Sequence, residues 1–198
     1  NTSADVKAET DVCCTSANAV KIVKSLGVKK VIFLPDDYLA KYVASQTDVE
    51  IIAWKGICMV HDQFNEKEIN DIRNKNPGIK IIAHPECPPE VIKASDFAGS
   101  TSGMINYVKN NQPKKVLLPD MKAGCSLSSS ITGKDVRLLK EKYPGVPVVS
   151  YVNTSADVKA ETDVCCTSAN AVKIVKSLGV KKVIFLPDDY LAKYVASQ

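Results

Sequence analysis

The stretch VPVVSYVNTSADVKAETDVCCTSANAVKIVKSLGVKKVIFLP, at residues 146–187, decides the fold class. It alternates short apolar runs, typical of strands buried on both faces, with segments whose apolar residues recur at helical spacing. Strands that alternate with helices indicate a parallel sheet with right-handed crossovers and helices on both faces. The sequence therefore predicts an α/β fold of pseudo-symmetric, three-layer αβα modules, each with a short parallel sheet.

The chain contains an exact duplication, because residues 1–46 recur without one change as residues 153–198. A natural duplication of any age would have diverged, so the identity indicates an assembly artefact or an engineered repeat. The word KKVLL resembles the KKVIFL of both copies and leads us to hypothesise a join at Leu118–Pro119. Because the second copy continues directly from the strand at residues 146–152, we expect it to complete that sheet. The first copy should then remain a half-module with exposed strand edges.

A second, diverged repeat is found when the chain is shifted by 67 residues, which aligns Cys58 with Cys125. Each repeat has a loop with Gly and Cys, a helix ended by Pro-Gly, a buried strand, and a second strand that leads into a helix through hydroxyl residues. The residues KKV, at the start of a further predicted strand, follow in both repeats. We therefore predict a partial module at residues 1–46 and two αβα modules at residues 47–118 and 119–198.

Composition argues against several function classes. The chain has 198 residues, of which 45% are hydrophobic and 24% charged, as in an ordinary globular protein. No apolar run approaches the roughly 20 residues that span a membrane, and no secretory leader is recognised. The net charge of +4 lies largely in Lys-Lys pairs without interleaved aromatic residues, so no nucleic-acid partner is predicted. We expect a cytoplasmic protein without membrane contact.

The polar residues at the predicted strand ends are the candidate site, because ligands of parallel sheets bind at the carboxyl ends of strands. In HPECP, His84 and Glu86 lie two residues apart and suit proton transfer, with His61 as the other histidine. A structural histidine beside a solvated Glu is the alternative. The pairs Ser100-Thr101 and Thr167-Ser168 each precede a helix, where they bind an anion or simply cap the helix.

The seven cysteines are an odd number and favour metal or redox chemistry over a disulfide framework. Cys58 and Cys125 occupy equivalent places in the two diverged repeats, and soft thiolates without neighbouring histidines favour an iron–sulfur cluster. Cys13-Cys14 and their copies Cys165-Cys166 lie in an apolar strand and are interpreted as core thiols. The role of Cys87 is left open.

Several motifs together resemble the quinolinate synthase family over the whole unique part of the sequence. They are MKAGCS at residues 121–126, PVVSYVNTSADVKAETDVCCTSANAV at 147–172, GICMVHDQF at 56–64, IIAHPECPPEV at 81–91 and AGSTSGM at 98–104. The resemblance implies three similar αβα modules around a [4Fe–4S] cluster held by one cysteine of each module. It also implies a transferase of NAD biosynthesis, which condenses iminoaspartate with dihydroxyacetone phosphate to quinolinate, and aspartate oxidase as the metabolic supplier.

The motifs carry the family's roles onto particular residues. Cys58 and Cys125 resemble two cluster ligands, and the open iron would act as a Lewis acid. The remaining site residues resemble groups that hold substrate carboxylates or phosphate (Tyr151, Asn153, Ser168, Ser100, Thr101) and groups that bind substrate and move protons (His61, His84, Glu86).

The sequence also departs from the family pattern. The family's remaining module, with a motif like AHNYQ, and the segment with the third cysteine ligand are absent from these residues. We therefore expect an enzyme fragment that is inactive alone. The alternatives are a non-catalytic scaffold that keeps only anion binding, and a chain whose join is an assembly artefact.

Overall fold

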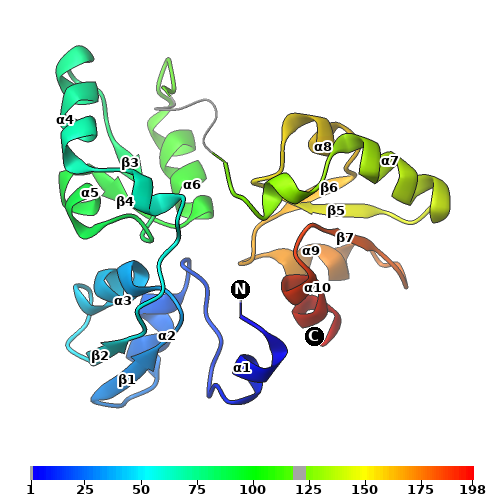
Figure 1. The fold of residues 1–198 in the computed structure, drawn as a ribbon, viewed down its shortest axis with the longest axis horizontal. Helices are drawn as coiled ribbons and strands as arrows, with labels where there is room; N and C mark the ends of the chain where they lie inside the picture. The colour runs from blue at the N-terminus through cyan, green and yellow to red at the C-terminus, as the bar shows by residue number, and fades with distance from the viewer. Residues whose placement is uncertain (1, 118–123) are drawn as a thin grey trace. The chain divides into compact units, whose positions relative to one another are not determined.

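A computed structural model describes residues 2–117 and 124–198, which form two compact units (Figure 1). The β5 unit comprises residues 2–13 and 124–198, and the Cys58 unit comprises residues 14–117. Their described parts combine helices with short parallel sheets, so the predicted α/β class is confirmed. None of the described helices is long and apolar enough to cross a membrane. The hypothesised join at Leu118–Pro119 lies outside the described residues.

The β5 unit is a three-layer module around the sheet order β6-β5-β7. Its strands are β5 (Val148–Tyr151), β6 (Val164–Cys166) and β7 (Ile184–Leu186), all parallel. The helices are α1 (Ala4–Ala8), α7 (Gly133–Lys142), α8 (Ala156–Ala160), α9 (Ala171–Ser177) and α10 (Asp189–Ala196), with the short helix η2 (Ser128–Ser130).

Neighbouring residues of β5 point to opposite faces of this sheet, and both faces are covered. Val148 packs with Val136 of α7 and Val158 of α8, whereas Val149 packs with residues of α9 and α10 (Figure 1). Both valines are fully buried. Burial on both faces explains why the strand reads as a continuous apolar run.

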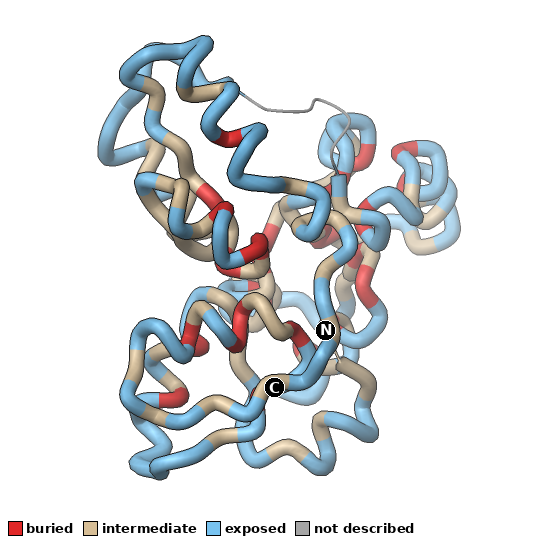
Figure 2. Tube along the Cα trace, turned by 60° about the vertical axis from the view of Figure 1, so that its left-hand side comes forward, coloured by how far each residue is buried: buried red, intermediate tan, exposed pale blue. Residues whose placement is uncertain are grey.

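The Cys58 unit contains two small parallel sheets. In the first, β1 (Lys30–Phe33) pairs with β2 (Glu50–Ala53), and in the second, β3 (Ile82–Ala83) pairs with β4 (Phe97–Ala98). The helices are α2 (Ala19–Ser25), α3 (Asp37–Ala44), α4 (Glu66–Lys75), α5 (Pro89–Ala94) and α6 (Thr101–Asn111), with η1 (His61–Gln63). Buried residues form several small clusters rather than one large core (Figure 2).

The 67-residue repeat recurs in the structure. Helix α4 has the same length as α7 and begins 67 positions earlier, and η1 and η2 are related in the same way. The register Ile82↔Phe97 of β3 and β4 corresponds to Val149↔Val164 of β5 and β6. The carboxylates of Asp96 and Asp163 likewise accept the backbone N–H groups of equivalent residues, Ile81 and Val148. The boundaries of the three predicted modules stay a prediction.

The two identical copies adopt different structures. β5 pairs with β6 and β7 of the second copy, as chain continuity predicts. In the first copy, residues 12–14 form no strand, although their sequence equals that of β6. The predicted strand at Cys13-Cys14 is therefore wrong for this copy, because a strand needs a neighbour and β5 is paired elsewhere. The strand predicted for KKVLL is also not formed by its described residues, 114–117.

Candidate metal and substrate site

The candidate site of the Cys58 unit is built by two loops that follow strands. In the loop after β2, the carbonyl of Cys58 accepts the N–H of Asp62 at 3.0 Å. This turn leads into η1 and places His61 one turn after Cys58. After β3, the carbonyl of His84 accepts the N–H of Cys87 at 3.0 Å, which turns the chain at Glu86. Both loops thus begin at the carboxyl end of a strand.

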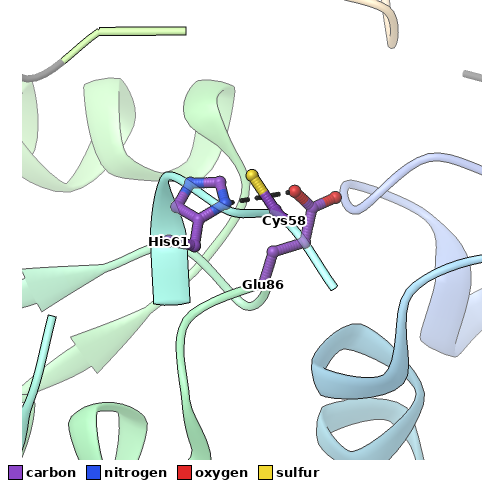
Figure 3. Close-up of side chains that lie close together, drawn as sticks. All are labelled: Cys58, His61 and Glu86. Atoms are coloured by element: carbon purple, nitrogen blue, oxygen red, sulfur yellow. Dashed lines mark ion pairs between the residues drawn. The ribbon is translucent and has the colours of Figure 1, made fainter. Parts of the chain in front are cut away.

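Three side chains from these loops lie close together. The Cys58 sulfur, a ring nitrogen of His61 and a carboxylate oxygen of Glu86 lie within 4.8 Å of one another (Figure 3). Nδ1 of His61 lies 3.3 Å from Oε2 of Glu86 but forms no well-directed hydrogen bond, although it is buried. His84 stacks on His61 with ring centroids 4.9 Å apart and planes 10° apart.

Charge in this cluster is shared between the histidine and its two neighbours. Burial alone would lower the pKa of His61, but contacts with the thiol of Cys58 and the carboxylate of Glu86 raise it to about 10. The contact with His61 in turn lowers the pKa of Cys58, against the effect of burial. Burial would raise the pKa of Glu86, and the contacts with both histidines reverse this and lower it. At neutral pH the cluster therefore combines an imidazolium and a carboxylate with a thiol whose pKa is lowered.

His84 differs from His61 because burial dominates its titration. Burial lowers the pKa of His84 to about 4, so its ring is neutral near pH 7. Nδ1 of His84 accepts the N–H of Glu86 at 3.4 Å, and Nε2 lies 3.1 Å from the hydroxyl of Ser16. The proton of the neutral ring is consequently assigned to Nε2, which donates to Ser16. This contact spans 68 residues and was not predictable from any sequence motif.

The remaining predicted residues are placed as follows. Ser100 is the N-cap of α6, and its hydroxyl accepts the N–H of Gly103 at 3.2 Å, with Thr101 as the first helical residue. Tyr151 ends β5 in the other unit, and its carbonyl accepts the N–H of Thr154. Asn153 is exposed and Ser168 is half-buried between β6 and α9.

Cys125 is the counterpart of Cys58 in the β5 unit. Its carbonyl accepts the N–H of Ser129 at 2.9 Å, as the carbonyl of Cys58 accepts that of Asp62. In the 67-residue register, the place of His61 is taken by Ser128, which is buried. The two loops thus share a backbone conformation but differ in the side chains around the thiol.

The donor set around Cys58 fits a metal group. A thiolate is a ligand for soft or borderline metals, and the buried Nδ1 of His61 and the carboxylate of Glu86 add further donors within reach. Among residues 2–117 and 124–198, this is the one group of at least three such side chains that lies close enough to hold an ion. Cys58 therefore has the surroundings expected of a ligand.

Comparison with known proteins decides the family. The family model described as quinolinate synthetase A protein matches residues 1–115 and, in a second match, residues 110–198. The chain belongs to the quinolinate synthetase A family. The resemblance predicted from the motifs is confirmed, and each match contains one copy of the duplicated segment.

The curated relatives that the chain matches are named quinolinate synthases. Quinolinate synthase 1 of Mesorhizobium japonicum is 56% identical over 131 residues, which are 66% of this chain and 40% of the relative. The quinolinate synthase of Xylella fastidiosa strain Temecula1 is 46% identical over 162 residues, or 82% of this chain and 44% of the relative. That of Sinorhizobium fredii is 55% identical over 131 residues, or 66% and 36%. The chain therefore spans about two-fifths of the length of these relatives.

Proposed function

We propose that this chain is part of a quinolinate synthase that condenses iminoaspartate with dihydroxyacetone phosphate to quinolinate in NAD biosynthesis. The observation that carries the proposal is the cluster of Cys58, His61 and Glu86 at the ends of β2 and β3, in a chain of this family. The substrates are small anions, iminoaspartate would be supplied by aspartate oxidase, and the reaction would take place in the cytoplasm.

Cys58 and Cys125 are the proposed protein ligands of a [4Fe–4S] cluster. The lowered pKa of Cys58 supports this role, because the thiolate is the ligating form. When bound, such a cluster supplies an open iron that polarises a substrate oxygen. The family pattern calls for a third cysteine, and we propose that the cluster is under-ligated and labile on this chain.

The ionisable side chains beside Cys58 would bind the substrates and transfer protons. Glu86 remains a carboxylate at neutral pH and can accept a proton, whereas His61 is an imidazolium that can donate one or hold a substrate carboxylate. Neutral His84 is held by Ser16 and can donate or accept a hydrogen bond without adding charge. We propose that these side chains bind the substrates and move protons between them.

The anionic groups of the substrates would be held at helix N-termini and in loops. Ser100 and Thr101 begin α6, a helix of 11 residues, whose terminal N–H groups and dipole favour an anion. Tyr151, Asn153 and Ser168 are the proposed carboxylate and phosphate contacts of the β5 unit. Each of these assignments rests on the motif and the position of the residue.

The test is anaerobic reconstitution of the full chain with iron and sulfide, followed by measurement of iron content and quinolinate formation. We expect iron and a visible iron–sulfur absorption band that C58S removes, and little or no quinolinate. The matched control C87S changes a buried cysteine beside the site and should keep its iron. A chain that takes up no iron but still binds dihydroxyacetone phosphate would replace the enzyme proposal by the anion-binding scaffold. Quinolinate formation at a normal enzyme rate would refute the expected inactivity.

A further inference from the structure

The first copy of the duplicated sequence exposes apolar side chains whose counterparts in the second copy are packed. In the second copy, Val158, Ile184 and Leu186 pack with α7 and β5. Val158 and Leu186 are 0% and 7% exposed there. Their counterparts in the first copy are Val6, Ile32 and Leu34, which are 37%, 69% and 39% exposed. The same three side chains therefore have a packing partner in one copy and lack it in the other.

The backbone of the repeated strand shows the same complementarity. In the first copy, the carbonyl of Phe33 accepts the N–H of Trp54, the residue that follows β2. In the second copy, the N–H of Ile184 is donated to the carbonyl of Pro147, next to β5. Ile184 corresponds to Ile32, the neighbour of Phe33, and successive residues of a parallel strand bond toward opposite edges. The repeated strand thus uses one edge for β2 in the first copy and the other edge for β5 in the second.

One strand of this sequence can consequently lie between β5 and β2. In the described parts of the chain, β1 pairs with β2 alone and β7 pairs with β5 alone. Aligned at the repeated strand, the order β6-β5-β7 and the order β1-β2 would give a sheet of four strands with the repeated strand between β5 and β2. Among the described strands, β1 therefore has no partner on the edge by which β7 pairs with β5, and β7 has none on the edge by which β1 pairs with β2.

We propose that the first copy takes the place of the second copy on the α7–β5 segment of a second molecule of this chain. The structure itself identifies the partner, since the second copy, which has the identical sequence, contacts this segment through β6, β7 and Val158. The product is a strand-exchanged dimer in which each molecule gives its first copy to the other.

The exchange keeps the number of strand pairs unchanged and joins them in one longer sheet. Each chain has one β5 and two copies of its partner sequence, so one copy must always remain without β5. Before exchange, β5 pairs with β6 and β7, and afterwards it pairs with residues 12–14 and β1. β1 keeps β2 in both states, so the exchanged sheet has four strands in series. Exchange of identical elements between molecules costs little at equilibrium, and free edges favour it.

A disulfide reports the exchange directly. Ser150 of β5 lies opposite Cys165 of β6, with Oγ and Sγ 3.6 Å apart. In the exchanged state the residue opposite Ser150 is Cys13, the counterpart of Cys165. In the variant S150C/C165S, the thiol introduced at position 150 can thus form this disulfide only with Cys13. After mild oxidation we expect a reducible dimer on a non-reducing gel, and its amount should increase with protein concentration. The triple variant S150C/C165S/C13S should form no such dimer.

The variant S150C/C13S is the matched control. It should form the disulfide with Cys165 inside one chain, which shows that the substitution at position 150 leaves β5 intact. If this control reacts and S150C/C165S forms no disulfide, the exchange does not occur. If S150C/C165S forms its disulfide with Cys13 only within monomers, the two copies compete inside one molecule and the proposed dimer is refuted.

A second pair of variants tests the apolar contact. I32K changes an exposed side chain and should leave the fold unchanged while it lowers the dimer fraction about tenfold or more, because a charge would enter a packed layer. I184K puts the same substitution into the second copy, where it weakens the existing contact, and should raise the dimer fraction. Equal effects of the two variants on the dimer fraction would contradict the proposal.

Discussion

Identical residues of the two copies should make unequal contributions to stability, and Val158 and Val6 are the sharpest pair. Val158 is fully buried against Val136, Val148 and Leu186, whereas Val6 is exposed. V158A removes two buried methyl groups, worth about 1.6 kcal/mol at about 0.8 kcal/mol for each buried carbon, and leaves a small cavity. We expect a loss of about 2 kcal/mol in the free energy of unfolding of the β5 unit. V6A should change this free energy by less than about 0.5 kcal/mol.

The assay is urea unfolding followed by circular dichroism at low protein concentration, where strand exchange between molecules is suppressed. Because the chain has two units, hydrogen exchange of the β5 amides should be measured alongside, to assign the loss to the β5 unit. Faster exchange of these amides is expected in V158A and not in V6A. Equal losses in both variants would refute the conclusion that only the second copy packs on β5.

Two further predictions concern titrating groups of the Cys58 unit. In the metal-free chain, Cys58 should react with iodoacetamide at lower pH than Cys87, because His61 lowers the pKa of Cys58 while burial raises that of Cys87 to about 11. H61A should shift the reaction of Cys58 to higher pH, and an unchanged pH profile would contradict the contact. The second prediction concerns Asp96, whose pKa is lowered to about 2, chiefly because its carboxylate accepts the N–H of Ile81. Its stabilising effect is present above about pH 4, its unfolded pKa, and is lost as the pH falls through about 2. D96N should therefore cost about 1 kcal/mol near neutral pH and nothing at the acid end, and a pH-independent difference in urea unfolding would argue against this.

Much of the fold follows from local sequence. Pro-Gly predicts the end of the helix in each repeat, and α4 ends at Lys75 and α7 at Lys142, just before it. The apolar run at residues 146–152 predicts a buried parallel strand, and β5 occupies its centre. The 67-residue spacing predicts equivalent elements, which recur from η1 and α4 to η2 and α7.

Other features depend on contacts that local sequence does not encode. Residues 12–14 and β6 have the same sequence, yet only β6 is a strand, because pairing depends on a neighbour. The position of Cys58, His61, His84 and Glu86 at strand ends was predictable from the alternation of elements. Their convergence was not, since it depends on how β2 and β3 are arranged, and the contact from Ser16 comes from the duplicated segment.

The most direct test of the proposed cluster site is the protection of individual cysteines from alkylation, measured by mass spectrometry before and after anaerobic reconstitution with iron and sulfide. Cys58, Cys87 and Cys125 lie in tryptic peptides of different sequence, so each can be quantified alone. We predict that reconstitution slows the alkylation of Cys58 and Cys125 and leaves that of Cys87 unchanged. Alkylation of Cys58 at the same rate with and without bound iron would contradict its role as a cluster ligand.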